Sequence, residues 1–198
     1  MYSENDPIWT QVEGQLRYVE AKQLFALAKA TKPNTVILEI GAYRGKSTVT
    51  LALGAKAGNK NRVYSVDPHL PFEWKKDHWI PYGSEDQAVF YKNLTDVGVG
   101  DAVYTISLTS AQAAKAWNEK NIGMLWIDGN HAYEHVAQDL RAWLPFVVDG
   151  GTVALHDFEL RGVRRAIREA RRRGDFIKKG HLRDPQKQKG LFWGVTSG

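Results

Sequence analysis

Residues 35–48, with the sequence TVILEIGAYRGKST, contain the patterns of three structural elements in succession. The apolar run at 35–38 is typical of a strand that is buried on both faces, and Glu39 stands where that strand should end. Residues 41–45 form a turn bracketed by two glycines, and Ser47 and Thr48 then open an apolar helix. A strand, a glycine turn and a helix N-terminus in this order predict a site for a nucleotide-type ligand in an open α/β sheet.

The spacing of the glycines distinguishes between the classes of ligand that bind at such a turn. A phosphate-binding P-loop has four residues between its first glycine and Gly-Lys-Ser/Thr, whereas only three lie between Gly41 and Gly45. A dinucleotide-binding turn needs a glycine where this chain has Tyr43. The remaining pattern, Glu-x-Gly-x-x-x-Gly-x-Ser, suits a ligand with an ammonium group and a ribose, namely S-adenosylmethionine. An ordinary strand-to-helix turn and a P-loop-like phosphate site are the alternatives.

The composition is that of a soluble globular protein, with 43% hydrophobic and 25% charged residues among 198. The absence of cysteine excludes disulfides, thiolate metal sites and cysteine catalysis. The N-terminus lacks a basic apolar signal segment and no apolar run approaches the ~18 residues of a membrane span, so we expect a cytoplasmic protein. The net charge of +5 is concentrated in residues 161–189, which hold twelve Lys and Arg residues and three acids.

Short apolar segments alternate with helical patterns along the chain. Further strands are expected at 62–67, 102–107, 122–127, 152–155, 176–182 and 191–196, and further helices at about 16–30, 84–97, 110–117, 132–144 and 161–173. This alternation predicts an α/β fold with a mostly parallel, doubly wound sheet. We expect one domain over residues 1–198, with a lead-in and a covering helix at 1–33 and the α/β core at 34–198.

Polar residues follow five of the expected strands, at the edge where ligands of such sheets bind. They are Glu39, Asp67, Thr109-Ser110, Asp128 and His156-Asp157. Asp67 can accept hydrogen bonds from both ribose hydroxyls of an adenosine, and a local turn is the alternative. Ser110 is expected to face the adenine edge, to cap the helix that it precedes, or both.

Asp128 leaves a buried strand and His131 follows three residues later, so both side chains can point into one small volume. Asp128 and Asp157 would offer two oxygen ligands to a hard cation such as Mg²⁺. Histidine is the side chain most suited to proton transfer near neutral pH, so His131 could take a proton from a substrate hydroxyl, with a structural histidine as the alternative.

Residues 68–83 contain three prolines and four aromatic residues without any periodicity. Long irregular segments in compact domains are usually functional or disordered, and the aromatic residues argue against disorder. We expect a lid over the crevice whose rings stack on a ring or a sugar face, or else simple packing onto the body of the protein. The four aromatic residues are Phe72, Trp74, Trp79 and Tyr82.

Residues 39–47 resemble the first motif of class I methyltransferases, in the catechol O-methyltransferase-like branch. A second motif resembles the small O-methyltransferases that include the macrolide-sugar and aminocoumarin enzymes and the cephalosporin-biosynthesis protein. The resemblance covers about residues 13–195 and implies a Rossmann-like seven-stranded sheet with an antiparallel last strand. It implies S-adenosylmethionine-dependent methyl transfer to a hydroxyl of a small molecule of the sugar or phenol type. The second motif consists of IDGNHAYE at 127–134, Asp139-Leu140, Trp143-Leu144-Pro145, Gly150-Gly151 and His156-Asp157.

The resemblance also implies roles for individual residues. His131 would be the general base beside a catalytic Asp128, and Asp128 and Asp157 would ligate a metal. The family often has two acids or Asp-Asn where this chain has His156-Asp157. His156 can ligate a metal, but it weakens the oxygen-rich site that Mg²⁺ prefers, so the need for a metal stays open. Cofactor contacts are expected at Glu39, Gly41, Ala42, Tyr43, Gly45, Ser47, Asp67, Thr109, Ser110 and Asp128.

Two other functions fit parts of the sequence. The predicted helix at 161–173 has an apolar stripe, formed by Val163, Ala166, Ile167 and Ala170, opposite a row of arginines. The arginines are either a solvated face or a phosphate-tracking surface of an RNA methyltransferase. A nucleotide-binding module without catalysis is the other alternative. The sequence does not decide whether the chain forms a homo-oligomer.

Overall fold

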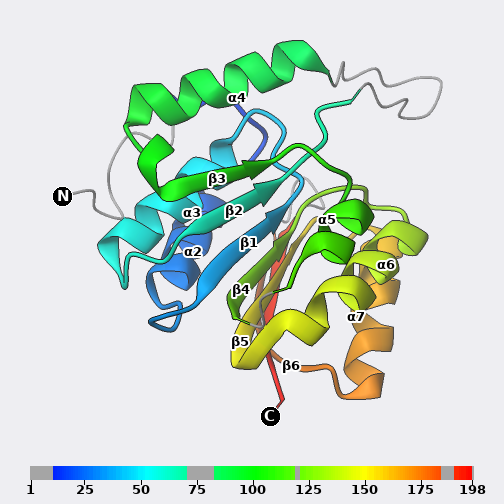
Figure 1. Ribbon diagram of the computed structural model, residues 1–198. Helices are drawn as coiled ribbons and strands as arrows, with labels where there is room; N and C mark the ends of the chain where they lie inside the picture. The colour runs from blue at the N-terminus through cyan, green and yellow to red at the C-terminus, as the bar shows by residue number, and fades with distance from the viewer. Residues whose placement is uncertain (1–10, 71–82, 119–120, 184–189, 198) are drawn as a thin grey trace.

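The computed structural model describes residues 11–70, 83–118, 121–183 and 190–197. Its centre is a seven-stranded sheet in the order β3-β2-β1-β4-β5-β7-β6 (Figure 1). Strands β1 to β5 pair in parallel, and β7 runs antiparallel to both β5 and β6. The predicted doubly wound sheet with an antiparallel last strand is confirmed. The strands are β1 (Val36–Ile40), β2 (Val63–Val66), β3 (Val103–Ile106), β4 (Ile122–Ile127), β5 (Val147–His156), β6 (Phe176–Arg183) and β7 (Gly190–Thr196).

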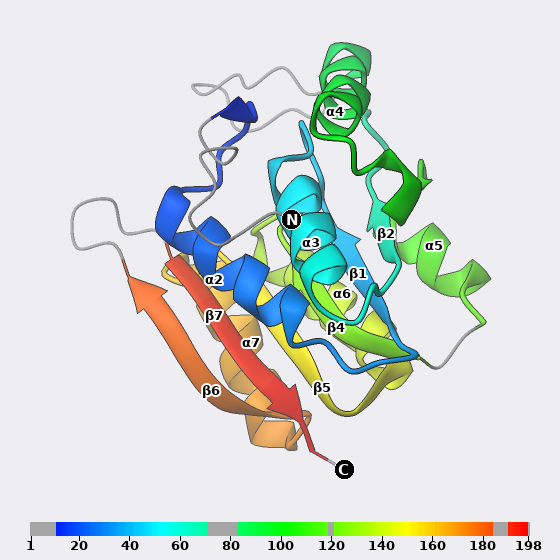
Figure 2. The same ribbon diagram turned by 90° about the vertical axis from the view of Figure 1, so that its left-hand side faces the viewer.

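Helices cover both faces of this sheet (Figures 1 and 2). One hydrophobic core contains Phe25 and Trp126, and the other contains Trp143, all three of them fully buried. Every residue of β1 and β4 is buried because both faces of these strands are covered, which explains their continuous apolar sequences. One face carries α2 (Tyr18–Lys29), α3 (Lys46–Ala57) and α4 (Ser84–Val97), and the other carries α5 (Ser110–Ala116), α6 (Tyr133–Trp143) and α7 (Arg161–Arg173).

The fifth strand begins earlier than expected. The sequence places this strand at 152–155, directly after Gly150-Gly151, but both glycines lie inside β5. Gly150 has a φ of +65°, and the pairing with β4 shifts from Ile122↔Val147 to Met124↔Thr152. The glycines therefore form an irregularity within the strand rather than a turn that precedes it.

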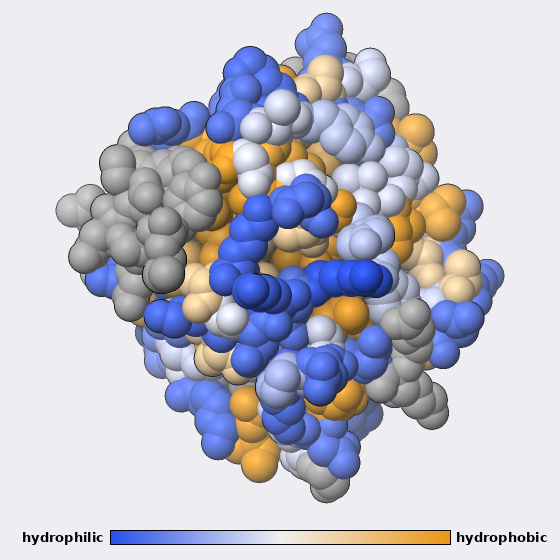
Figure 3. Space-filling model, turned by 60° about the vertical axis from the view of Figure 1, so that its left-hand side comes forward, coloured by the Kyte–Doolittle hydropathy of each residue, from blue (hydrophilic) through white to orange (hydrophobic). Residues whose placement is uncertain are grey.

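The predicted apolar stripe of α7 is confirmed, because its four residues are buried against the sheet. On the face shown in Figure 3, hydrophilic side chains cross the apolar surface and divide it. Within the described ranges, no helix is both long enough and apolar enough to cross a membrane.

Parallel pairing places the carboxyl ends of the central strands side by side. Ile40 pairs with both Val66 and Ile127, and Ile127 pairs with Leu155. The residues that follow these strand ends are therefore neighbours, although they are up to about 120 positions apart in the chain.

Candidate functional site

The turn at 41–45 packs against the end of β4. Gly41 has a φ of +86°, and a Cβ atom at this position would lie 2.6 Å from the carbonyl oxygen of Asp128. Only glycine fits such a close approach. The turn also holds Tyr43 at a φ of +50° and ends at Gly45, after which α3 begins. The N–H groups of the first turn of α3 therefore lie at the turn, where they favour polar or anionic ligand groups.

Asp67 holds this turn in place. Its Oδ2 accepts hydrogen bonds from the backbone N–H groups of Ala42 (2.8 Å) and Tyr43 (2.9 Å), and its Oδ1 accepts one from the N–H of His69 (2.8 Å). The structure thus places Asp67 at the turn. Its contact with a ribose stays a prediction.

Glu39 lies beneath the turn and is fully buried. Its carboxylate accepts hydrogen bonds from Ser47 Oγ (2.6 Å), Thr48 Oγ1 (2.5 Å) and Ser65 Oγ (2.7 Å). Burial raises the pKa of Glu39 to about 7, although the three hydroxyl groups act in the opposite direction. Glu39 therefore has a supporting role, since its hydrogen bonds join β1, β2 and α3 below the glycine turn.

Four predicted side chains meet where β4 and β5 end. His131 Nε2 lies 3.5 Å from Asp128 Oδ1 and 3.5 Å from Asp157 Oδ2. His156 Nδ1 lies 2.9 Å from the same oxygen of Asp128. The structure brings these residues together, and their catalytic and metal-binding roles stay predictions.

Glu20 joins this cluster from α2 and was not predicted. Its Oε2 lies 3.3 Å from His156 Nε2 and accepts hydrogen bonds from the backbone N–H (3.1 Å) and the Nε (3.0 Å) of Arg17. Glu20 is fully buried, four residues before Leu24 on the covered side of α2. An acidic residue in line with an apolar stripe was the signal that the sequence offered.

The cluster contains a buried histidine between carboxylates. Burial lowers the pKa of His156, but Asp128, Glu20 and Asp157 together raise it well above 6.5. Burial raises the pKa of Asp128, but His156 and His131 bring it down to about 2. Glu20 also has a pKa of about 2, because His156 and Arg17 outweigh its burial. The surrounding carboxylates therefore favour the charged form of His156.

A hollow lies beside the glycine turn, and residues of this turn and of the cluster at the ends of β4 and β5 both line it. Glu39, Gly45, Asp67, Thr109 and Ser110 do not line it, whereas the other predicted site residues do. Residues 14–16 and Lys46 line it as well and were not predicted. Among the described residues, the lining consists of Gly14, Gln15, Leu16, Gly41, Ala42, Tyr43, Lys46, Ser47, Asp128, His131, His156 and Asp157.

Residues 38–158 match a family model described as a methyltransferase domain. The chain belongs to this methyltransferase family. The match spans more than half of the chain and includes the glycine turn, Asp67 and the cluster after β4 and β5. The protein is therefore a methyltransferase.

Solved structures share the methyltransferase fold over nearly the whole chain. An O-methyltransferase from Bacillus cereus in complex with SAH matches with a TM-score of 0.74 and 16% identity, over 98% of this chain and 92% of that one. The O-methyltransferase TomG from Streptomyces achromogenes, involved in tomaymycin synthesis and in complex with SAM, gives 0.74 and 16%, over 98% and 91%. An rRNA methylase from Streptococcus thermophilus gives 0.65 and 13%, over 94% and 100%. At these identities the likeness concerns the fold alone.

The start of α5 in the methyltransferase differs from the expectation for Ser110. Thr109 is the N-cap, because its Oγ1 accepts a hydrogen bond from the N–H of Gln112 and its own N–H donates to the Gln112 side chain. Ser110 Oγ donates to Asp139 Oδ1 (2.5 Å) and accepts from Trp143 Nε1 (2.9 Å). The predicted capping by Ser110 is therefore wrong. Its side chain points toward α6, which does not favour a contact with adenine.

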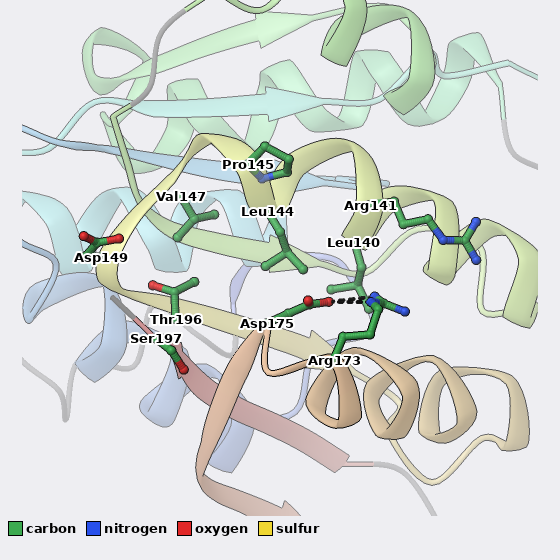
Figure 4. A pocket seen from close by; sticks show the side chains of 10 residues that line it. All are labelled: Leu140, Arg141, Leu144, Pro145, Val147, Asp149, Arg173, Asp175, Thr196 and Ser197. Atoms are coloured by element: carbon green, nitrogen blue, oxygen red, sulfur yellow. Dashed lines mark hydrogen bonds and ion pairs between the residues drawn. The ribbon is translucent and has the colours of Figure 1, made fainter.

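The methyltransferase has a second, larger hollow at the opposite edge of the sheet (Figure 4). It lies where β5 begins and β7 ends, and the ion pair of Arg173 and Asp175 (2.6 Å) borders it. Ligands of parallel sheets bind beyond the carboxyl ends of the strands, so we do not assign the cofactor to this hollow. It is lined by Leu140, Arg141, Leu144, Pro145, Val147, Asp149, Arg173, Asp175, Thr196 and Ser197.

The predicted lid residues Phe72, Trp74, Trp79 and Tyr82 lie outside the described residues. The helix that follows them, α4, is attached to the glycine turn. Arg44 Nε donates to Asp86 Oδ1 (2.7 Å) and Asn93 Nδ2 donates to the carbonyl oxygen of Arg44 (2.7 Å).

Replacing Asp67 with alanine should weaken the binding of S-adenosylhomocysteine by about 1–3 kcal/mol, because the N–H groups of the turn lose their acceptor, as would the ribose hydroxyls in the predicted contact. Isothermal titration calorimetry measures this difference. Asp96→Ala, which removes an exposed acid on α4, is the matched control and should bind like the wild type. Unchanged affinity in Asp67→Ala would show that Asp67 contributes nothing to the cofactor site.

Proposed function

We propose that this methyltransferase transfers the methyl group of S-adenosylmethionine to a hydroxyl of a small molecule of the sugar or phenol type. The observation that carries the proposal is the position of His131 beside the hollow, 3.5 Å from the carboxylates of both Asp128 and Asp157. A hydroxyl must lose its proton as its oxygen attacks the methyl carbon, and an imidazole near two carboxylates is suited to accept that proton.

In the proposed reaction the turn at 41–45 and Asp67 hold the cofactor, so that the methyl group and the acceptor oxygen lie in line. Positioning of this kind is worth roughly 7–11 kcal/mol of the barrier. The acceptor oxygen forms a bond to the methyl carbon while the carbon–sulfur bond breaks and its electron pair returns to sulfur. The hydroxyl proton passes to His131, and S-adenosylhomocysteine is the second product.

The resemblance implied a metal such as Mg²⁺ at Asp128 and Asp157, with His156 as a further ligand that departs from the family pattern, and the residues present do not fit this ion. Donor atoms of Asp128, His131 and His156 lie within 4.8 Å of one another, which is close enough to surround one ion. Mg²⁺, however, requires octahedral oxygen ligands, and two of these three donors are imidazoles. The oxygen of Asp128 nearest to His131 is also the atom that pairs with His156. We therefore derive no step through a metal.

RNA is the second candidate acceptor, and the surface of α7 is the observation that favours it. Arg165 pairs with Glu169 (3.0 Å), whereas Arg164, Arg168 and Arg172 are exposed on the helix. A basic row of this kind binds phosphates or is simply solvated.

Replacing Arg164, Arg168 and Arg172 with glutamine should leave methyl transfer to a small acceptor unchanged, because α7 presents these arginines to solvent. Any RNA binding by the wild type should be weak and should fall steeply with salt. Both are measured with methyl-labelled S-adenosylmethionine and a filter-binding assay. A large loss of activity on the small acceptor would contradict this assignment, and salt-resistant RNA binding that the triple variant abolishes would favour the RNA alternative.

A further inference from the structure

The ring of His156 is fixed between carboxylates from two different parts of the fold. Nδ1 lies 2.9 Å from Asp128 Oδ1 after β4, and Nε2 lies 3.3 Å from Glu20 Oε2 on α2. Asp157 Oδ1 lies 3.8 Å from Nδ1. The residue is only 5% exposed, and its ring packs near that of Trp126 at a centroid distance of 5.8 Å. Each nitrogen therefore lies near a carboxylate oxygen, and the ring has little room to turn away from these oxygens.

The charges around this ring are balanced by side chains of the protein. Buried carboxylates need a positive partner, since an unpaired buried charge is strongly destabilising. Glu20 has Arg17 as a partner, and Asp128 has His156. In a metal site at the ends of β4 and β5, a divalent ion would supply the positive charge to Asp128. A His156 ring that is protonated between Asp128 and Glu20 would place a like charge at contact distance from such an ion, in a buried setting.

We infer that His156 takes the place of a divalent cation in this methyltransferase, so that the cluster keeps Asp128 paired and positions His131 without a metal. The inference rests on the proposed O-methyl transfer, because it concerns the site that would activate the acceptor hydroxyl. His156 is then a positioning residue, and the acceptor proton goes directly to His131.

The same positions of His156, Asp128 and Glu20 also allow a second arrangement, in which the site would bind a metal ion. A ring that is neutral could offer Nδ1 to an ion and donate Nε2–H to Glu20, as histidine ligands often do with an outer carboxylate. In that arrangement the wild type would bind one divalent ion per chain through Asp128. Metal titration therefore separates the two arrangements without reference to activity.

The experiment is isothermal titration calorimetry of Mg²⁺, Mn²⁺ and Zn²⁺ into chelator-treated full-length protein saturated with S-adenosylhomocysteine. We expect no ion to bind at one per chain to the wild type. His156→Asp should gain such a site for Mg²⁺ or Mn²⁺, because the substitution removes a positive group and adds an oxygen ligand beside Asp128 and Asp157. His135→Asp, which adds the same carboxylate at an exposed position of α6, is the matched control and should gain none.

Binding of one ion per chain by the wild type, lost in Asp128→Asn, would overturn the inference. Failure of a folded His156→Asp variant to gain an ion would overturn it too, because His156 would then not be what keeps the ion out. If His156→Asp does not fold, His156→Asn offers a neutral oxygen ligand for the same titration. Failure of the proposed function is a separate result, seen as the absence of methyl transfer in protein that binds S-adenosylhomocysteine.

Discussion

Replacing His131 with alanine is expected to lower kcat by ~10²–10⁴-fold while the affinity for S-adenosylhomocysteine stays nearly unchanged. The reason is that in the proposed reaction His131 accepts the proton of the acceptor hydroxyl, and that it lies outside the glycine turn that is proposed to hold the cofactor. Steady-state kinetics with a methylated-product assay and calorimetry of the cofactor product measure the two quantities.

His135→Ala is the matched control for this substitution, since it removes a histidine from an exposed position on α6, four residues further along the chain. It should retain wild-type turnover. A His131→Ala variant that keeps more than about a tenth of the activity would exclude His131 as the general base, because general-base catalysis contributes at least ~10²-fold.

Removing the carboxylate of Glu39 should have the largest effect on stability. Glu39→Ala leaves the hydroxyl groups of Ser47, Thr48 and Ser65 buried without their common acceptor. At roughly 1 kcal/mol or more for each group, the free energy of unfolding should fall by about 3 kcal/mol or more. Denaturant unfolding followed by circular dichroism measures this change. A loss below about 1 kcal/mol would mean that these hydrogen bonds contribute little.

The protonation of Glu39 should also make stability depend on pH. Its pKa in the folded protein is about 7, compared with 4.5 for an ordinary glutamate. The folded state therefore binds this proton more tightly than the unfolded state does. The resulting stabilisation, at most about 3 kcal/mol, is complete below pH 4.5 and is lost as the pH rises through about 7. Glu39→Gln should lack this dependence, and unfolding curves at pH 5 and pH 8 compare the two proteins.

The features that the sequence predicted correctly depend on local patterns. The apolar segments at β1 and β4 reveal strands that are covered on both faces, and the glycine spacing at 41–45 reveals the turn. Parallel strands end at one edge, so the meeting of Asp128 with His156 followed from the order of the elements alone. No distance between side chains was needed for these inferences.

The features that were missed depend on packing between distant elements. Glu20 reaches His156 because α2 packs on the same face of the sheet as α3, and its place in line with an apolar stripe indicates burial but not this partner. Ser110 was placed toward the cofactor because it follows a strand, but its hydroxyl hydrogen-bonds with Asp139 and Trp143 of α6. In both cases a long-range contact determines where the side chain points, and a single sequence does not record such contacts.

Transfer of a ¹³C-labelled methyl group from S-adenosylmethionine, followed by NMR of the products, tests the central claim most directly. The wild type would be incubated with a panel of sugars and phenols, with cellular RNA present as a competing acceptor. We predict that the label enters a small acceptor as a methyl ether on oxygen and that His131→Ala abolishes this signal. Label found only in RNA, or bonded to nitrogen or carbon of the small acceptors, would contradict the proposed O-methyl transfer.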